Sequence, residues 1–97
     1  MPTYDLDPRF GRDFDRSSRS QQRAFRAAVA LLVADFRAGR AASPQLRMKA
    51  VQGHDGVFEI SFAPDGRASF HFGAEVRPGH QHIVWRRIGT HDIFRNP

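Results

Sequence analysis

The feature that most constrains this chain is a pair of alternating segments joined by a tight turn in its second half. Residues 57–63 and 67–72 alternate apolar and polar side chains, as strands with one buried face do. Between them lies Pro64-Asp65-Gly66, in which proline comes first and glycine last. This order favours a three-residue loop with the glycine in the left-handed conformation. The two segments are therefore predicted to form an antiparallel β-hairpin.

The length of the loop predicts the register of the hairpin. A three-residue loop pairs Ala63 with Arg67 and Ile60 with Phe70. One face of the hairpin then carries apolar side chains: Phe58, Ile60, Phe62, Ala68, Phe70 and Phe72. The opposite face carries polar ones: Glu59, Ser61, Arg67, Ser69 and His71. Because the apolar face must be covered, helices are expected on that side of the sheet.

The first half of the chain supplies these helices. Tyr4 and Leu6 alternate with polar neighbours and predict a short first strand. Asp7-Pro8 has the residues of an N-cap and a first helical position, and this helix should continue to about Arg16. A second helix is predicted from the capping box at 18–21 to Gly39, which suits a C′ position. Its apolar stripe has helical spacing and comprises Phe25, Ala28, Val29, Leu32, Val33 and Phe36.

Two further strands complete the predicted sheet. Residues 46–50 alternate and predict an edge strand that ends at Gly53, and residues 82–88 predict the last strand. Ninety-seven residues suffice for one domain. We therefore expect residues 1–97 to form a single α+β domain, with a short N-terminal strand and two helices on one face of an antiparallel sheet.

Composition narrows the class of protein. The net charge is +5, and Lys49 is the only lysine among 15 basic residues. This charge favours a polyanionic partner, although an acidic protein would also satisfy it. The absence of cysteine excludes disulfides, a thiolate nucleophile and a cysteine zinc site. No signal peptide is visible, and the longest apolar stretch, 27–34, is too short for a bilayer, so a cytoplasmic protein without membrane contact is expected.

The polar face of the hairpin has two interpretations. It gathers Glu59, His71 and Arg67, and Arg86 or Arg87 of the last strand could lie beside them. Such a group of titratable and cationic side chains is typical of an active or binding surface. Most polar sheet faces, however, are simply solvated, and the residue types leave both interpretations open.

A metal site is weakly indicated. His80 and His82 lie close in sequence, but no carboxylate or cysteine has the usual ligand spacing relative to them. We therefore expect neither a metal nor another cofactor.

Four short stretches of this sequence resemble a known family. They are Leu46-Arg47-Met48-Lys49, residues 56–60 (Gly-Val-Phe-Glu-Ile), Gly66-Arg67 and residues 88–94 (Ile-Gly-Thr-His-Asp-Ile-Phe). Together with the order of elements, they resemble the RelE/ParE superfamily of bacterial toxins, and within it the YafQ-like and RelE-like branch that cleaves mRNA. The resemblance covers the whole chain in layout and implies a curved sheet.

This resemblance implies a function. YafQ-like and RelE-like proteins are ribosome-dependent endoribonucleases of type II toxin-antitoxin systems, each neutralised by an antitoxin encoded beside it. The expected partners are thus the ribosome, mRNA and an acidic antitoxin. A sister branch of ParE-like proteins inhibits DNA gyrase. The alternative is therefore a non-catalytic protein-binding module on the same fold, either a gyrase inhibitor or a homologue without toxicity.

The family's functional positions fall on particular residues of this chain. The arginine after the central turn corresponds to Arg67, and the basic residue on the preceding strand corresponds to Lys49. The C-terminal Gly-Thr-His and the aromatic after it correspond to residues 89–91 and Phe94. Phe94 stands where RelE-like members have tyrosine, which removes a hydroxyl and shifts proton transfer onto His91. The lysine-rich patch of RelE-like enzymes is nearly absent.

The expected chemistry needs no metal. A base takes the proton of the RNA 2′-hydroxyl, a cation stabilises the charged phosphorane, and an acid protonates the leaving 5′-oxygen. Histidine suits proton transfer near neutral pH, and arginine aims two donors at a phosphate. The predicted catalytic residues are Arg67 for the phosphate and His91 for proton transfer, with Glu59, His71 and His54 as weaker candidates for the second proton-transfer role. The predicted RNA-binding residues are Lys49, His54, Arg86, Arg87 and Phe94, the last by stacking on a base.

Overall fold

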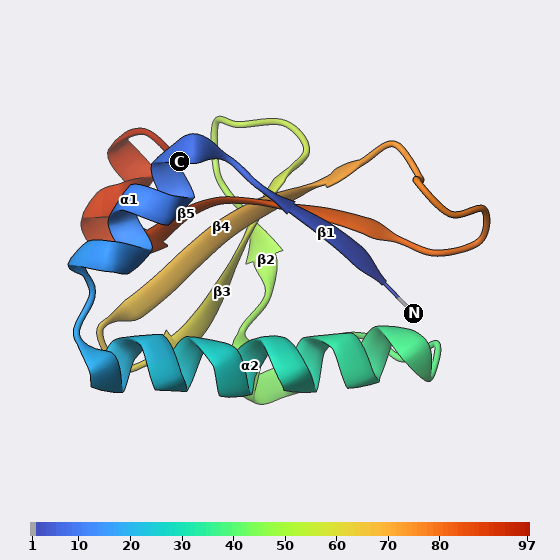
Figure 1. Ribbon diagram of the computed structural model, residues 1–97, viewed down its shortest axis with the longest axis horizontal. Helices are drawn as coiled ribbons and strands as arrows, with labels where there is room; N and C mark the ends of the chain where they lie inside the picture. Colours follow the sequence, from blue (N-terminus) through green and yellow to red (C-terminus); the bar gives the residue numbers. More distant parts are fainter. Residues whose placement is uncertain (1) are drawn as a thin grey trace.

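The computed structural model describes residues 2–97 as an α+β fold in which a five-stranded sheet is packed against helices (Figure 1). The strands lie in the order β1-β5-β4-β3-β2, and all neighbours are antiparallel except β1 and β5. The predicted class is confirmed, and the parallel pairing of β1 makes the sheet mixed. In chain order the elements are β1 (Thr3–Leu6), α1 (Pro8–Arg16), α2 (Arg19–Arg37), the 3-10 turn η1 (Pro44–Leu46), β2 (Lys49–Ala50), β3 (Val57–Ala63), β4 (Gly66–Gly73), β5 (His82–Gly89) and the 3-10 helix η2 (His91–Arg95).

Both helices begin and end where the capping residues predict. The Asp7 carboxylate accepts the backbone N–H of Arg9 at 2.8 Å, with Pro8 at the first helical position. The Ser18 hydroxyl accepts the backbone N–H of Gln21 at 3.1 Å. Gly39 follows α2 with φ +69°, the left-handed conformation that a C′ glycine adopts readily. Within residues 2–97, neither helix has the length and apolar character that crossing a bilayer requires.

The hairpin of β3 and β4 forms as predicted, but its register differs by two residues. Phe58 pairs with Phe70 and Ser61 with Arg67, and a bulge lies between Ser61 and Ala63. The loop is shorter than predicted because Gly66 already pairs with Ala63. An even shift leaves every side chain on its predicted face.

The reason for glycine at position 66 also differs from the prediction. Gly66 is not among the glycines with positive φ in residues 2–97. A Cβ atom at this position would lie only 2.5 Å from the Phe62 ring. Gly66 therefore provides room for an aromatic side chain rather than a left-handed backbone conformation.

The predicted edge strand over residues 46–50 is mostly wrong. Pro44–Leu46 form the turn η1, and Arg47 adopts the left-handed conformation with φ +48°. Only Lys49–Ala50 pair with β3 as β2. Leu46 is buried, as the alternation at 46–50 requires, but it belongs to the turn η1 and not to a strand.

A buried carboxylate holds the connector between α2 and η1. Asp35 is 1% exposed and lies within the predicted apolar stripe of α2. Its Oδ2 accepts the backbone N–H of Ser43 at 2.7 Å and the Ser43 hydroxyl at 2.8 Å, and Arg40 donates to Oδ1 at 3.0 Å. These hydrogen bonds from Ser43, with a smaller contribution from Arg40, hold the pKa of Asp35 below its usual range.

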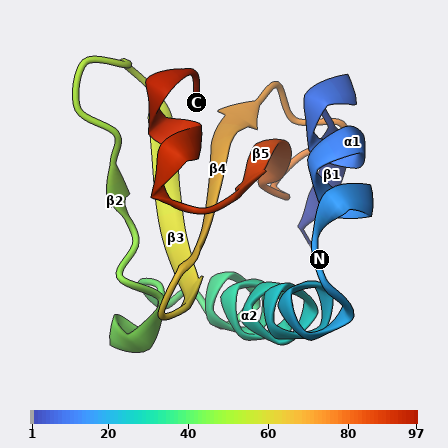
Figure 2. The same ribbon diagram turned by 90° about the vertical axis from the view of Figure 1, so that its left-hand side faces the viewer.

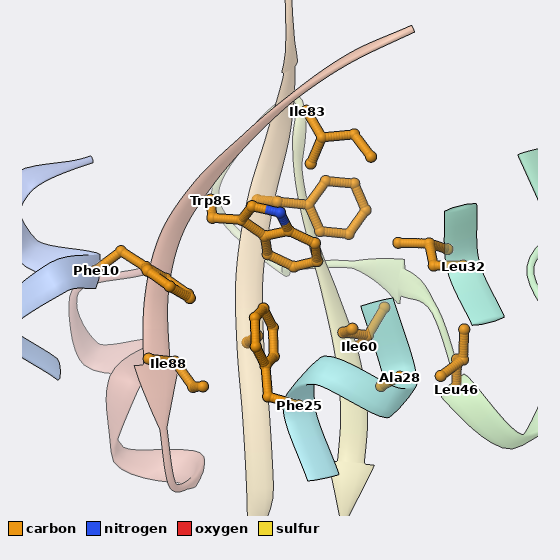
Figure 3. Close-up of a cluster of buried hydrophobic side chains, with 11 residues drawn as sticks. Phe10, Phe25, Ala28, Leu32, Leu46, Ile60, Ile83, Trp85 and Ile88 are labelled. Carbon is orange, nitrogen blue, oxygen red and sulfur yellow. The ribbon is translucent and has the colours of Figure 1, made fainter. Parts of the chain in front are cut away.

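The core forms between α2 and one face of the sheet, as the two apolar patterns predict (Figure 3). Trp85 is at its centre, with ring centroids 5.0 Å from Phe25 and 5.1 Å from Phe70. Phe10 of α1 joins the same cluster and lies 5.4 Å from Phe25. Rings of this size bury enough area for a short chain to fill a core with few residues.

The opposite face of the sheet is partly covered. Val57, Glu59 and Ser69 are buried there. η2 packs against β4 and β5, well away from α2 in both ribbon views (Figures 1 and 2). The interpretation of this face as an ordinary solvated surface is therefore wrong for its central residues.

Candidate active site on the polar face

A row of polar side chains crosses the sheet on this face. Four strands each contribute one residue in direct register, namely Lys49, Glu59, Ser69 and Arg87. The Lys49 ammonium lies 3.9 Å from Oε1 of Glu59. Glu59 is 7% exposed, whereas the Lys49 side chain is 70% exposed. The row thus presents a cation to solvent at one end and buries its carboxylate.

Ser69 stands in the middle of this row with an unsatisfied hydroxyl. It is fully buried, and its Oγ is the only buried side-chain nitrogen or oxygen within residues 2–97 that lacks a hydrogen-bond partner. Buried polar atoms without partners are rare in folded proteins. The alternation of residues 67–72 predicts the correct face for Ser69 but does not distinguish it from the other polar residues there.

Arg87 closes the other end of the row by pairing with α1. Its guanidinium donates to both carboxylate oxygens of Asp13, at 2.5 and 3.2 Å, and to the backbone oxygen of Asn96 at 3.1 Å. The Asp13 pair raises the pKa of Arg87. Oδ2 of Asp13 also accepts the backbone N–H of Ile88 at 3.3 Å, beyond the point where β1 stops pairing with β5. Asp13 therefore accepts a hydrogen bond from a backbone N–H at the open edge of β5, a role that no sequence pattern predicted.

His71 and Arg86 form a second polar pair on the same face. Nη1 of Arg86 lies 3.0 Å from Nδ1 of His71. A guanidinium only donates, so Nδ1 accepts and the neutral ring carries its proton on Nε2. Burial, followed by the positive charge of Arg86, lowers the pKa of His71. His71 is therefore neutral at pH 7 and presents a donor rather than a base.

Arg67 is held at the hairpin turn. Its Nη1 lies within hydrogen-bond distance of the backbone oxygens of Gly66, Ala63 and Pro64, at 2.9, 3.1 and 3.4 Å. Nε and Nη2 donate to no acceptor within residues 2–97. One edge of the guanidinium is thus fixed by the turn, and the other edge remains open for an anion.

His91 and Phe94 come from η2, which is anchored at the end of β5. Thr90 caps this helix by accepting the backbone N–H of Asp92 at 3.3 Å. Ile93 is buried, and a Cβ atom at Gly89 would lie 3.0 Å from its Cγ2. The exposed His91 ring meets the Phe94 ring edge-on, with centroids 5.1 Å apart and an interplanar angle of 86°.

The β4–β5 register relates the two predicted catalytic residues. Arg67 pairs with Gly89, two residues before His91. The start of β4 therefore lies beside the end of β5, two residues before η2 begins. A cavity of about 310 Å³ lies beside the same segment, and its lining includes Gly89, Thr90 and Asp65.

Two histidines lie apart from this group. The side chain of His54 is exposed in the loop before β3, and no contact within residues 2–97 joins it to the other candidates. His82 is buried, with Nδ1 2.7 Å from the Thr3 hydroxyl and Nε2 3.0 Å from the Asp5 carboxylate. Both of its ring nitrogens are thus engaged in joining β1 to β5. Among residues 2–97, His, Asp and Glu side chains form no group of three or more that could hold a metal ion.

Comparison with known proteins rests on structure alone. No protein-family model matches the sequence, and no curated protein matches it. The fold is similar to YafQ from E. coli, with a TM-score of 0.71, 12% identity and coverage of 95% of this chain and 96% of that chain.

Two further solved structures are complexes with antitoxins. In the E. coli DinJ-YafQ toxin-antitoxin complex the TM-score is 0.71 at 13% identity, over 94% of this chain and 93% of the matched chain. In the RelB-RelE antitoxin-toxin complex from Methanococcus jannaschii it is 0.59 at 12% identity, over 94% of each chain. The likeness extends over nearly the full length of each protein. This chain therefore shares the fold of the YafQ and RelE structures.

Proposed function

We propose that this chain is the toxin of a bacterial type II toxin-antitoxin pair and that it cuts mRNA on the ribosome. The observation that carries the proposal is the exposed His91, edge-on to Phe94, on a helix anchored next to Arg67. An exposed imidazole can transfer a proton, and a guanidinium with one open edge can stabilise the phosphorane, so the pair supplies two of the three roles that metal-free cleavage of RNA needs. The shared fold supports the same conclusion.

The reaction is an internal transfer of the phosphoryl group. The 2′-oxygen attacks the adjacent phosphorus and loses its proton, and the bond from phosphorus to the 5′-oxygen breaks. The products are a 2′,3′-cyclic phosphate and a 5′-hydroxyl. Arg67 stabilises the charge on the phosphorane with its open edge, and His91 moves a proton. No metal or other cofactor takes part.

The other predicted residues have supporting roles. Glu59 and His71 are weaker candidates for the second proton transfer, because Glu59 is buried and Nδ1 of His71 already accepts from Arg86. The exposed Lys49 is suited to a phosphate. Phe94 is suited to stacking on a base. His54, Arg86 and Arg87 remain proposed RNA contacts, although Arg86 and Arg87 have protein partners in the free chain.

The proposed partners are the ribosome, mRNA and an acidic antitoxin encoded by an adjacent gene. The chain has a net charge of +5, which an acidic protein would neutralise. YafQ and RelE, which share this fold, were crystallised with the antitoxins DinJ and RelB. The proposed site of action is the bacterial cytoplasm, where ribosomes and mRNA meet.

The test is induced expression without an antitoxin, followed by incorporation of labelled precursors. Protein synthesis should fall before DNA synthesis. Purified chain should cut mRNA on ribosomes and leave ribosome-free mRNA intact. A zinc-specific chelator, with magnesium retained for the ribosomes, should not change the rate of cutting. Loss of cutting that returns with added zinc would overturn the metal-free mechanism.

A non-catalytic module, such as a ParE-like gyrase inhibitor, is the alternative. Two observations favour it: Phe94 has no hydroxyl, and Lys49 is the only lysine. Under this alternative, DNA synthesis stops first and gyrase-type DNA damage appears. The same labelling experiment therefore separates the two functions.

A further inference from the structure

We propose that the outer face of α2 is a docking surface for the sugar-phosphate backbones of double-helical RNA, separate from the site for cleavage. The side of α2 that faces the sheet buries Phe25, Ala28 and Leu32. The opposite side carries four exposed arginines with the spacing of one helix face: Arg19, Arg23, Arg26 and Arg37. In both ribbon views this side of α2 forms a boundary of the molecule (Figures 1 and 2).

No acidic side chain within residues 2–97 neutralises the positive charge of this surface. The only acidic residue of α2 is Asp35, which is buried and bound to Ser43 and Arg40. None of the four arginines pairs with a carboxylate within residues 2–97. Arg26 instead lies over the Phe14 ring, with its guanidinium carbon 5.3 Å from the ring centroid. The face therefore attracts anions along its whole length.

Arg19 is at a position that opposes helix stability. Arg19 is the first residue of α2 and Arg23 lies one turn later, and no acidic residue occupies the first turn. The N-terminal end of a helix is the positive end of its dipole, where cations are unfavourable. An anion bound at this end of α2 would gain from both the dipole and the guanidinium groups.

The shape of the face favours RNA duplex over an acidic protein. Between Arg26 and Arg37, the most outward positions are Ala30 and Ala34, both exposed. Protein interfaces usually centre on buried aromatic or large aliphatic side chains, whereas the centre of this face is alanine. The exposed apolar side chains of Tyr4 and Leu6 lie to one side, in a groove that Arg26 also lines. A centre of small residues with cations at both ends suits a nucleic-acid duplex, because its two backbones present two rows of phosphates. Arg26 and Arg37 are 11 residues apart, which is roughly 16 Å along a helix.

The same shape favours A-form RNA over DNA. An A-form duplex has a wide and shallow minor groove, which a helix can cross while its side chains reach phosphates on both sides. The minor groove of B-DNA is too narrow for a helix, and its major groove admits one only when the helix enters a groove about 8.5 Å deep. One face of α2 is buried in the core, so its outer face alone is available to a nucleic acid. Ribosomal RNA offers many A-form duplexes, but this binding does not depend on cleavage activity.

The experiment measures binding of the whole chain to a 20-base-pair RNA duplex by fluorescence anisotropy over a range of salt concentrations. A DNA duplex and a single-stranded RNA of the same sequence are measured in parallel. We expect the RNA duplex to bind most tightly, with an affinity that falls steeply with salt. The double variant Arg23→Gln/Arg37→Gln should weaken duplex binding about tenfold and reduce the salt slope by about 2.

The matched control is Arg77→Gln/Arg95→Gln, which removes the same charge from exposed positions outside α2. It should leave duplex binding within about twofold of the unaltered chain. A third variant, Ala30→Leu/Ala34→Leu, keeps all charges and helix propensity but adds bulk at the centre. It should weaken duplex binding, because the backbone of the duplex can no longer approach α2.

Three results would overturn the proposal. The first is that the Arg77/Arg95 control loses as much binding as the Arg23/Arg37 variant. The second is that the unaltered chain binds single-stranded RNA as tightly as duplex RNA. The third is that the unaltered chain binds poly-glutamate, a model of an acidic protein, more tightly than duplex RNA. The first would make the effect one of net charge, and the last would make the partner an acidic protein. Circular dichroism of each variant checks that α2 remains folded.

Discussion

Arg86 donates a hydrogen bond to Nδ1 of His71 across β4 and β5, at a distance of 3.0 Å. The guanidinium also reaches the backbone oxygen of Pro97, at 3.2 Å from Nη2. One arginine therefore joins the polar face of the sheet to the segment that follows η2. It also determines which nitrogen of His71 carries a proton.

This pair predicts a pH dependence. Burial and the charge of Arg86 lower the pKa of His71 below its ordinary value of about 6.5 in an unfolded chain. The folded state therefore binds a proton at His71 less readily than the unfolded state does. The contribution to stability is fully present above pH 6.5 and is lost as the pH falls below that value.

Proton NMR titration of the His71 ring measures this effect. In Arg86→Gln the pKa of His71 should rise, because the neighbouring positive charge is gone while burial remains. An unchanged His71 pKa in the variant would show that Arg86 has no influence on it.

His91→Ala should separate activity from stability. The side chain is exposed and its described contact is with the Phe94 ring, so the free energy of unfolding should change by less than about 1 kcal/mol. Cleavage of mRNA on ribosomes should fall roughly 10²-fold or more, because a proton carrier is lost. Asp92→Asn, at an exposed neighbouring position, is the control and should retain cleavage. Full activity in His91→Ala would remove the proposed proton carrier.

Arg67→Ala should reduce both properties. It removes the contacts of Nη1 with three backbone oxygens of the turn, and we expect a loss of about 1 kcal/mol in stability. Cleavage should fall by roughly 10²-fold, since aimed charge contributes on that scale. Arg67→Lys keeps the charge without the planar fork. If Arg67→Lys melts like the unaltered chain and cuts at the full rate, the forked geometry is irrelevant to the reaction.

Asp13→Ala should destabilise the fold by roughly 1–3 kcal/mol, because it leaves Arg87 without its carboxylate partner and the backbone N–H of Ile88 without its acceptor. In a domain of this size that corresponds to a fall in melting temperature of several degrees. Asp15→Ala, at an exposed position of the same helix, is the control. A double-mutant cycle with Arg87→Ala should give a clear coupling energy, and additive effects would contradict the pairing.

Gly66→Ala should destabilise the hairpin by about 1–3 kcal/mol through overpacking. The new Cβ would lie 2.5–2.8 Å from three atoms of the Phe62 ring. Gly11→Ala is a matched control, since a Cβ there meets nothing within 4 Å and the site is inside α1. That change should stabilise the chain by about 0.5–1 kcal/mol. Equal melting temperatures for both variants would show that Phe62 moves aside without penalty.

The sequence by itself determined the local elements of this protein. Capping residues such as Asp7 and Ser18 fix helix starts through hydrogen bonds within a few residues, so the pattern suffices to predict them. The alternation in β3 and β4 determined which side chains face the core, and a two-residue error in register left that result intact.

Only the tertiary structure decided what the polar side chains touch. Asp13 and Arg87 are 74 residues apart in sequence, and Thr3 and His82 are 79 apart, so no local pattern relates either pair. Burial of Glu59 and Ser69 likewise depends on a face of the sheet being covered by segments distant in sequence. Local sequence determines hydrogen bonds within a turn or a helix. Contacts between distant residues follow from how the elements pack, and these contacts determine the protonation of His71 and the availability of Arg87.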